Sequence, residues 1–131
     1  MVARSRGGDS APSAAVTFTA GGVAGNPDTL LAAMTVAPDA TRETAIRALC
    51  TALQSGSLSG SNIWNKLDVF HIYAAHDQQA ANLNWVNPAA YTAVPTLSPT
   101  WTADRGYTTN GTSSYVDTGF NPGGGGTPLF Q

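Results

Sequence analysis

The sequence predicts a small α+β domain, and three observations predict this class. Residues 39–56 carry a helical stripe of apolar side chains, and short segments of β type follow residue 99. All three Trp, all four Tyr and two of the four Phe lie between Trp64 and Phe120. Because large aromatic rings bury the most area, we expect the core within residues 63–120. The expected architecture is an N-terminal helical lead-in packed on a small antiparallel sheet of β-sandwich type, which can be incomplete.

Composition divides the chain of 131 residues into three parts. Residues 1–13 mix Gly, Ser, Ala, Pro and Arg without periodicity, which predicts a flexible tail. Residues 14–122 are long enough for a single α+β domain with a modest core. Residues 123–131 begin with four consecutive glycines, whose ordering is costly, so they are interpreted as a linker to a C-terminal peptide.

The first half of the domain is predicted to be mainly helical. Residues 14–20 alternate as a short half-buried strand, and Asn26-Pro27-Asp28 is a turn before an apolar run of undecided type. Asp39 or Thr41 can cap a helix of about four turns, which Ser55-Gly56 ends. Residues 57–61 form a flexible joint. The apolar stripe of this helix has the spacing i, i+3, i+4 and i+7, and its members are Ile46, Leu49, Cys50 and Leu53.

The second half is predicted to hold the strands. Asn62 or Ser61 caps a short helical turn with Trp64. Residues 69–75 are apolar on both faces apart from His71, which suits a central strand or a strand-like segment. Asp77 begins a helical turn over residues 78–83. A Thr/Pro-rich connection over residues 92–99 then leads to three β segments, at residues 100–103, 106–108 and 113–118.

Asn110-Gly111 predicts a tight hairpin turn between the last two β segments, because both residues accept the positive φ of such turns. Together with Thr112 it also matches a glycosylation acceptor, but the turn explains the residues better.

The low charge excludes several classes of function. Only 11% of the residues are charged, with six basic and eight acidic side chains. Arg4 and Arg6 in the tail are too few for a nucleic-acid-binding face.

No apolar run is long enough to span a membrane, and the N-terminus lacks the apolar centre of a signal peptide. Surfaces with few charges and many hydroxyl and amide groups are typical of secreted and virion proteins that pair with other subunits.

The candidate metal ligands are too few for a site. Cys50 is the only cysteine and is predicted to be a small buried apolar residue. His71, His76 and Asp77 have no further His, Cys or Glu nearby, whereas a zinc site needs three or four converging ligands. We therefore expect no metal and no cofactor. His71 is interpreted as a hydrogen-bonded core or interface residue, and the pair His76-Asp77 as a cap of the following turn.

The sequence does not predict an enzyme. It has no Gly-x-Ser-x-Gly motif, and Glu43, the only glutamate, lies on the exposed helix face. Asp104, Arg105 and Asp117 could converge, although an Asp-Arg pair in a tight turn is more often structural. A small hydrolase that uses Asp104, Asp117 or His71 is the weakest alternative.

Exposed aromatic rings that stack on sugars are the main sign of a lectin in a sequence. The candidates for glycan or partner contact are Trp85, Tyr91, Trp101 and Tyr107. The alternative for each is a place in the aromatic core of a small domain.

Five motifs stand out in two blocks of the sequence, at residues 64–68, 74–77, 83–88, 102–107 and 110–122. They are Trp-x-Lys-Leu-Asp, Ala-Ala-His-Asp, Leu-Asn-Trp-x-Asn-Pro, Thr-Ala-Asp-Arg-Gly-Tyr and Asn-Gly-x-Ser-Ser-Tyr-x-Asp-Thr-Gly-Phe-Asn-Pro. With these motifs, about residues 41–122 resemble tail- or virion-associated proteins of bacteriophages and prophages that contain a concanavalin- or laminin-G-like jelly roll. The resemblance implies a structural or attachment role in a virion, with host glycan binding as a family-level option, and it implies no catalytic residues.

From the resemblance we expect a non-enzymatic virion protein of the tail, collar, spike, fibre or capsid-decoration class. Its partners are expected to be other virion proteins and further copies of itself, and its location the virion, reached without a signal peptide. The alternative is a lectin-like carbohydrate-binding module. Members of the family continue well past the Phe-Asn-Pro block. This sequence is therefore expected to be either the N-terminal portion of a longer protein or a shortened version whose missing strands come from neighbours. An incomplete sheet favours an assembly in which neighbours pair with its edges.

Overall fold

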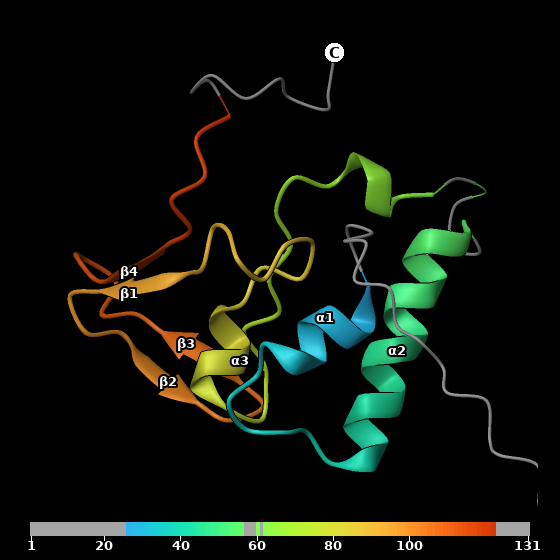
Figure 1. Ribbon diagram of the computed structural model, residues 1–131. Coiled ribbons are helices and arrows are strands. Elements are labelled where there is room, and N and C mark those ends of the chain that lie inside the picture. Colours follow the sequence, from blue (N-terminus) through green and yellow to red (C-terminus); the bar gives the residue numbers. More distant parts are fainter. Residues whose placement is uncertain (1–25, 57–59, 61, 123–131) are drawn as a thin grey trace, which may run out of the picture.

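The computed structural model describes residues 26–56, 60 and 62–122, and these residues form a small α+β fold, as predicted. Figure 1 shows helices α1 and α2 on one side, the strands on the other side, and α3 between them. The expectations for residues 1–13, 14–20 and 123–131 lie outside the described residues. The elements in chain order are α1 (Pro27–Ala32), α2 (Ala40–Ser55), the 3-10 turn η1 (Trp64–Lys66), α3 (Gln78–Asn82), β1 (Val94–Thr96), β2 (Thr100–Thr102), β3 (Gly106–Thr108) and β4 (Tyr115–Asp117).

Helix α1 includes residues that were predicted as a turn and an apolar run. Asn26 caps it, since its Oδ1 accepts a hydrogen bond from the backbone N–H of Asp28 at 2.9 Å. Pro27 follows at the first helical position, where its fixed φ suits a helix and its missing N–H costs nothing. The turn residues are therefore the start signal of a helix that buries Leu30.

Helix α2 agrees with the prediction at both ends and along its stripe. Asp39 caps it by accepting from the N–H of Arg42 at 2.8 Å, and Gly56 ends it with a left-handed φ of 73°. Ile46, Cys50 and Leu53 are buried. Leu49 is partly buried against the same cluster.

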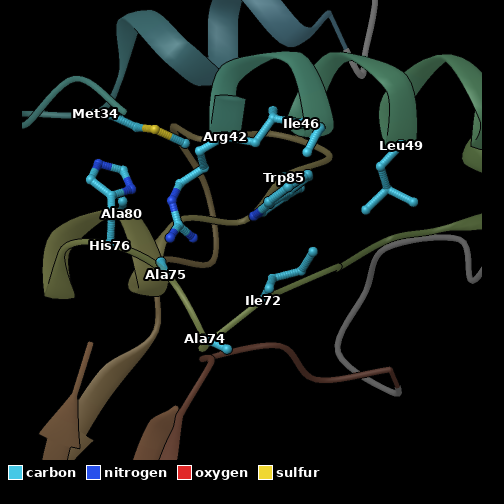
Figure 2. A pocket seen from close by; sticks show the side chains of 11 residues that line it. Met34, Arg42, Ile46, Leu49, Ile72, Ala74, Ala75, His76, Ala80 and Trp85 are labelled. Atoms are coloured by element: carbon cyan, nitrogen blue, oxygen red, sulfur yellow. The ribbon is translucent and has the colours of Figure 1, made fainter. Parts of the chain in front are cut away.

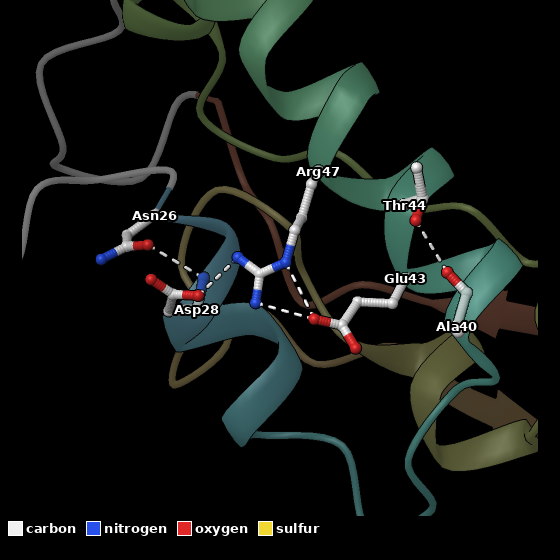
Figure 3. Close-up of polar contacts among 6 residues, drawn as sticks. All are labelled: Asn26, Asp28, Ala40, Glu43, Thr44 and Arg47. Carbon is white, nitrogen blue, oxygen red and sulfur yellow. Dashed lines mark hydrogen bonds and ion pairs between the residues drawn. The ribbon is translucent and has the colours of Figure 1, made fainter.

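Arg47 connects the two helices on the outer side of α2 (Figure 3). Its guanidinium pairs with Asp28 of α1 and, at 2.9 Å, with Glu43 one turn earlier in α2. All three side chains are more than one-third exposed. Exposed ion pairs contribute about 0–1 kcal/mol, so Arg47 orients α1 more than it stabilises the fold.

The hydrophobic core joins the helices to the chain that follows them. The predicted aromatic stretch contributes only part of it, since α1 and α2 supply the aliphatic side chains. Phe70 bridges the two buried Trp rings edge-on, with centroids 6.4 Å from Trp64 and 5.7 Å from Trp85. The buried members are Leu30, Ile46, Cys50, Leu53, Trp64, Leu83 and Trp85.

Of the two predictions for residues 69–75, a central strand and a strand-like segment, the structure contradicts the first. This segment has no assigned strand, and its backbone bonds with loops. The N–H of Phe70 donates to the side chain of Asn84, the carbonyl of Phe70 accepts from the N–H of Trp85, and Ala75 accepts from the N–H of Asp104. None of these residues is fully buried, so the apolar pattern indicated partial burial, which a strand shares with an extended segment that has no ladder.

The strands form two separate antiparallel pairs, β1–β4 and β2–β3. β2 and β3 lie where strands were predicted, but β1 lies in residues 92–99, which were predicted to be a connection. The sequence Val94-Pro95-Thr96 forms a strand despite its proline, as an edge strand can. Each ribbon, as we call these pairs, has two strands of three residues.

Asn110-Gly111 forms a turn, but the predicted hairpin is wrong, because β3 pairs with β2 and β4 pairs with β1. Gly111 has the expected positive φ of 76°. The Oδ1 of Asn110 accepts from the N–H groups of Thr112, Ser113 and Ser114. These bonds close a local loop, which carries the chain from one ribbon to the other.

Candidate functional site

Four rings form a continuous group between the extended segment 69–75 and the β2–β3 ribbon. We call this group the aromatic strip; its members are His71, Tyr73, Trp101 and Tyr107. The imidazole of His71 is stacked on Tyr73, with centroids 5.6 Å apart and planes inclined by 16°. Tyr73 meets Tyr107 edge-on at 5.7 Å. Trp101 lies opposite Tyr107 in the strand register and donates its indole N–H to the carbonyl of Tyr73 at 3.2 Å.

The local structure explains this gathering. Residues two apart in an extended segment point to the same side, which places His71 beside Tyr73. Directly opposite residues of an antiparallel pair share one face, which places Trp101 beside Tyr107. The strip therefore depends on docking the extended segment against the ribbon. All four residues are half-buried.

Polar groups of α3 border the aromatic strip. The hydroxyl of Tyr107 donates to Oδ1 of Asn82 at 2.7 Å and accepts from the side-chain amide of Gln78 at 3.2 Å. Burial and the neighbouring Tyr107 raise the pKa of Tyr73, so that its phenol stays neutral. Burial lowers the pKa of His71, although its Nε2–H donates to the carbonyl of Tyr91 at 3.0 Å. The strip is thus an uncharged aromatic surface with amide and hydroxyl groups at its side.

The four candidate contact residues do not form one site. Trp101 and Tyr107 lie together in the aromatic strip. Trp85 is 6% exposed and belongs to the core. Tyr91 is exposed, has a φ of 56°, and packs edge-on against Phe120 at 5.4 Å. Only its carbonyl reaches the strip, through His71. His71 and Tyr73 were not among the candidates; the alternation of rings within residues 69–75 is the signal that could have found them.

A second surface lies on the β1–β4 ribbon and the loop that follows β1. We call it the ribbon face; its members are Val94, Leu97 and Tyr115, which are 57%, 63% and 50% exposed. The register pairs Val94 with Asp117 and Thr96 with Tyr115, so Val94 and Tyr115 share a face, and Leu97 lies in the loop directly after β1. Pro95 and Val116, which alternate with them, are more buried. The predicted alternation within residues 115–118 is present, but it puts a large aromatic ring on the outer side.

The predicted ligands and acid–base groups have separate partners. His76 does not cap α3; its Nε2 lies 2.9 Å from the carbonyl of Val36, and Asp77 alone caps the helix. Asp104 pairs with Arg42 of α2 at 2.6 Å, whereas the pairing considered from the sequence was with Arg105. Asp117 accepts from the N–H of Gly119. Within residues 26–56, 60 and 62–122, no three His, Cys, Asp or Glu side chains are grouped to hold a metal ion.

Comparisons of this chain with protein-family models, with curated proteins and with solved structures found no match in any of the three. In the part of the chain that the structure describes, no helix is long and apolar enough to cross a membrane.

Proposed function

We propose that this chain is a non-enzymatic structural protein of a bacteriophage virion, from the tail, collar, spike, fibre or capsid-decoration class. It acts by packing against other virion proteins and further copies of itself. The resemblance of residues 41–122 to virion-associated proteins supports the virion location. The observation that carries the packing role is the ribbon face, where three large apolar side chains are at least half exposed.

Two physical arguments connect this surface with assembly. An isolated two-stranded ribbon is marginally stable in water, and its unpaired edges can accept a further strand. A group of adjacent exposed apolar side chains more often marks an interaction surface than a surface that stays in contact with water. The β1–β4 ribbon combines both features, so a neighbour that covers it removes apolar area from water and pairs an edge.

The first test is the mass of the full chain in solution, measured by light scattering behind a sizing column. We expect a trimer or a larger ring. Changing Val94, Leu97 and Tyr115 together to Thr, Ser and Thr should reduce the mass to that of a monomer. The matched control is Val36→Thr, which changes an exposed apolar residue outside the ribbon face and should leave the mass unchanged. A wild-type monomer at all concentrations contradicts self-assembly.

The virion location has its own test. The protein should be present at a fixed ratio to the major structural proteins in purified particles of the phage or prophage that encodes it. Absence of the protein from those particles would contradict the virion proposal, whatever molar mass the chain has in solution.

A carbohydrate-binding module is the second candidate, and the aromatic strip favours it. Half-buried rings bordered by Asn82 and Gln78 combine stacking surfaces with amide groups, as sugar sites do. On a glycan array we expect binding that Trp101→Ala abolishes while the circular dichroism spectrum is kept. Tyr115→Ala, which lies outside the strip, is the control. If the wild-type chain binds no glycan on the array, the result contradicts this candidate function.

A further inference from the structure

The two edges of the β1–β4 ribbon differ, and Pro95 is the cause. In an antiparallel pair, residue pairs that exchange two backbone hydrogen bonds alternate with pairs that exchange none. Pro95 has no N–H and lies opposite Val116, so these two residues form a pair without bonds. The residue pairs on either side of them are the bonded ones. The backbone groups of Pro95 and Val116 therefore point away from each other, to opposite edges of the ribbon.

The edge of β1 is closed to a further strand. Pro95 offers no N–H on this side, and proline on an edge strand prevents pairing. The N–H of Ala93, which points to the same side two residues earlier, donates to the carbonyl of Asn82 at 2.8 Å. One donor of this edge is therefore missing, and the other is occupied.

The edge of β4 is open. Neither the backbone N–H nor the carbonyl of Val116 has a hydrogen-bond partner among the described residues, and the same is true of Thr118. Tyr115 and Asp117, the neighbours of Val116, are exposed, so solvent reaches the strand. Unpaired backbone groups at a sheet edge bind an extended segment, which then adds a strand.

Residues 14–20 have the sequence pattern that this edge requires. They are predicted as a strand with Val16, Phe18 and Ala20 on one face and threonines on the other. The segment contains neither proline nor a charged residue, so each of its residues has an N–H to donate and none repels the ribbon. Its seven residues are more than the three of β4, so it can pair along the whole strand.

The position of α1 favours a neighbouring copy as the acceptor of this segment. Only five residues, 21–25, separate residue 20 from Asn26, the cap of α1. Figure 1 shows that α1 begins beside α2, on the side of the molecule away from β4. A strand given by each copy to the next makes a head-to-tail contact, and such contacts close into rings.

We propose, on the basis of the self-assembly proposed above, that residues 14–20 of one copy add a strand to the β4 edge of the next copy. The N–H and the carbonyl of Val116 pair with the added strand. That strand also lies beside Tyr115 of the ribbon face, so the open edge and the exposed apolar side chains belong to one interface.

A second place on the molecule suits an apolar segment. A cavity of about 180 Å³ lies between α2, residues 72–76 and α3, and most of its wall is apolar, with Met34, Ile46, Leu49 and Ile72 (Figure 2). Residues 72–76 form no strand, so this cavity would bind side chains without pairing a backbone. Ala45→Leu adds bulk at an exposed position of its wall and is the control for this competing site.

The molar mass of the full chain, measured by light scattering, tests the donated strand. Thr17→Pro together with Phe18→Pro removes one N–H from each side of the segment, so no register can avoid the change, and we expect a monomer. The matched control, Thr17→Val with Phe18→Tyr, keeps both N–H groups and a high β propensity. This control and Ala45→Leu should both keep the mass of the wild type.

Two measurements test the accepting edge. Val116→Pro removes an N–H that takes no part in the pairing with β1, and it should give a monomer whose circular dichroism spectrum is that of a folded chain. Val116→Ala keeps the N–H and should stay assembled. By NMR, the amide of Val116 should exchange with deuterium at least roughly fivefold more slowly in the wild type than in the chain with both prolines.

Crosslinking shows which copy gives the strand. A chain with Thr17→Cys is co-expressed with a chain with Asp117→Cys, and a short bismaleimide is added; Cys50 is buried and does not compete. We expect a crosslink between the two chains. Ala103→Cys, an exposed position on the other ribbon, replaces Asp117→Cys in the control and should give none.

Three results overturn the proposal. The chain with both prolines keeps the mass of the wild type, in which case another surface carries the assembly and self-assembly itself stands. Ala45→Leu gives a monomer, in which case the cavity takes the segment. A chain with both cysteines crosslinks internally while the co-expressed chains do not, in which case the segment pairs with its own β4. A wild-type monomer contradicts the self-assembly itself.

Discussion

The side chain of Asn84 is fully buried and connects three parts of the chain. Its Oδ1 accepts from the N–H groups of Phe70 and Val86, each at 3.1 Å, and its Nδ2 donates to the carbonyl of Ala90 at 3.2 Å. The extended segment 69–75 has no strand ladder, so these bonds replace part of one. Asn84 is therefore a structural residue that no apolar pattern could indicate.

We expect Asn84→Ala to lower the free energy of unfolding by about 3 kcal/mol, because two N–H groups and one carbonyl lose a buried partner. Urea denaturation measures the change. Asn87→Ala is the matched control, since Asn87 makes a similar side-chain bond, to Ala89, in an exposed turn. It should cost less than about 1 kcal/mol. Equal losses in the two variants would show that burial of Asn84 is not the cause.

His71 makes the stability depend on pH. Burial lowers its pKa in the folded state, so near its ordinary pKa of about 6.5 the unfolded chain binds more protons. The contribution of the neutral ring is present above that pH and is lost as the pH falls through the folded pKa. We expect the free energy of unfolding to fall between pH 7 and pH 5 more steeply in the wild type than in His71→Gln, measured by urea denaturation. Parallel curves for the two proteins would contradict this assignment.

At the scale of elements, the docking of the β2–β3 ribbon on the extended segment depends on a glycine. Gly106 begins β3 with a φ of 87°, and a Cβ there would lie 3.2 Å from Cβ of Tyr73. An added Cβ would therefore be in tight contact with Tyr73, which would have to shift by a few tenths of an ångström, and the positive φ adds strain for any residue but glycine. The same approach brings Tyr107 against Tyr73 in the aromatic strip.

We expect Gly106→Ala to cost about 2–3 kcal/mol, because a left-handed backbone and a steric contact act together. Gly111→Ala is the matched control: Gly111 has a φ of 76°, but nothing lies within 4 Å of an added Cβ. That variant should cost only the backbone strain of about 1 kcal/mol. Thermal or urea unfolding compares the two. If they lose the same stability, the close approach to Tyr73 is not a constraint.

At the scale of the whole molecule, one half of the fold contains the hydrophobic core, and the other half consists of the two ribbons. Helices α1 and α2 and the segment around Trp64 and Trp85 share the core. The two ribbons extend from it as separate strand pairs. A neighbour that covers the half with the two ribbons would stabilise the folded state, because it would remove apolar area from water.

If copies of the chain cover the ribbon face, the thermal midpoint should rise with protein concentration, because association stabilises the folded state by mass action. Differential scanning calorimetry over a hundredfold range of concentration measures this. The variant with Val94, Leu97 and Tyr115 replaced should show no such rise. A wild-type midpoint that is independent of concentration argues for a monomer.

The sequence by itself determined helices α2 and α3 and the class of the fold, whereas the residues of α1 were predicted as a turn and an apolar run. The cap at Asp39, the stripe from Ile46 to Leu53 and the stop at Gly56 are local signals, and each acts within one turn of the helix. The same is true of Asp77 before α3. These elements could be predicted because nothing distant is needed to form them.

Tertiary structure decided the strand pairing and the grouping of functional side chains. Pairing β1 with β4 joins residues 94–96 to residues 115–117, and no local pattern specifies a partner at that distance. The apolar run 69–75 indicated a strand or a strand-like segment, and only the long-range bonds of Asn84 and the docked ribbon decide between the two.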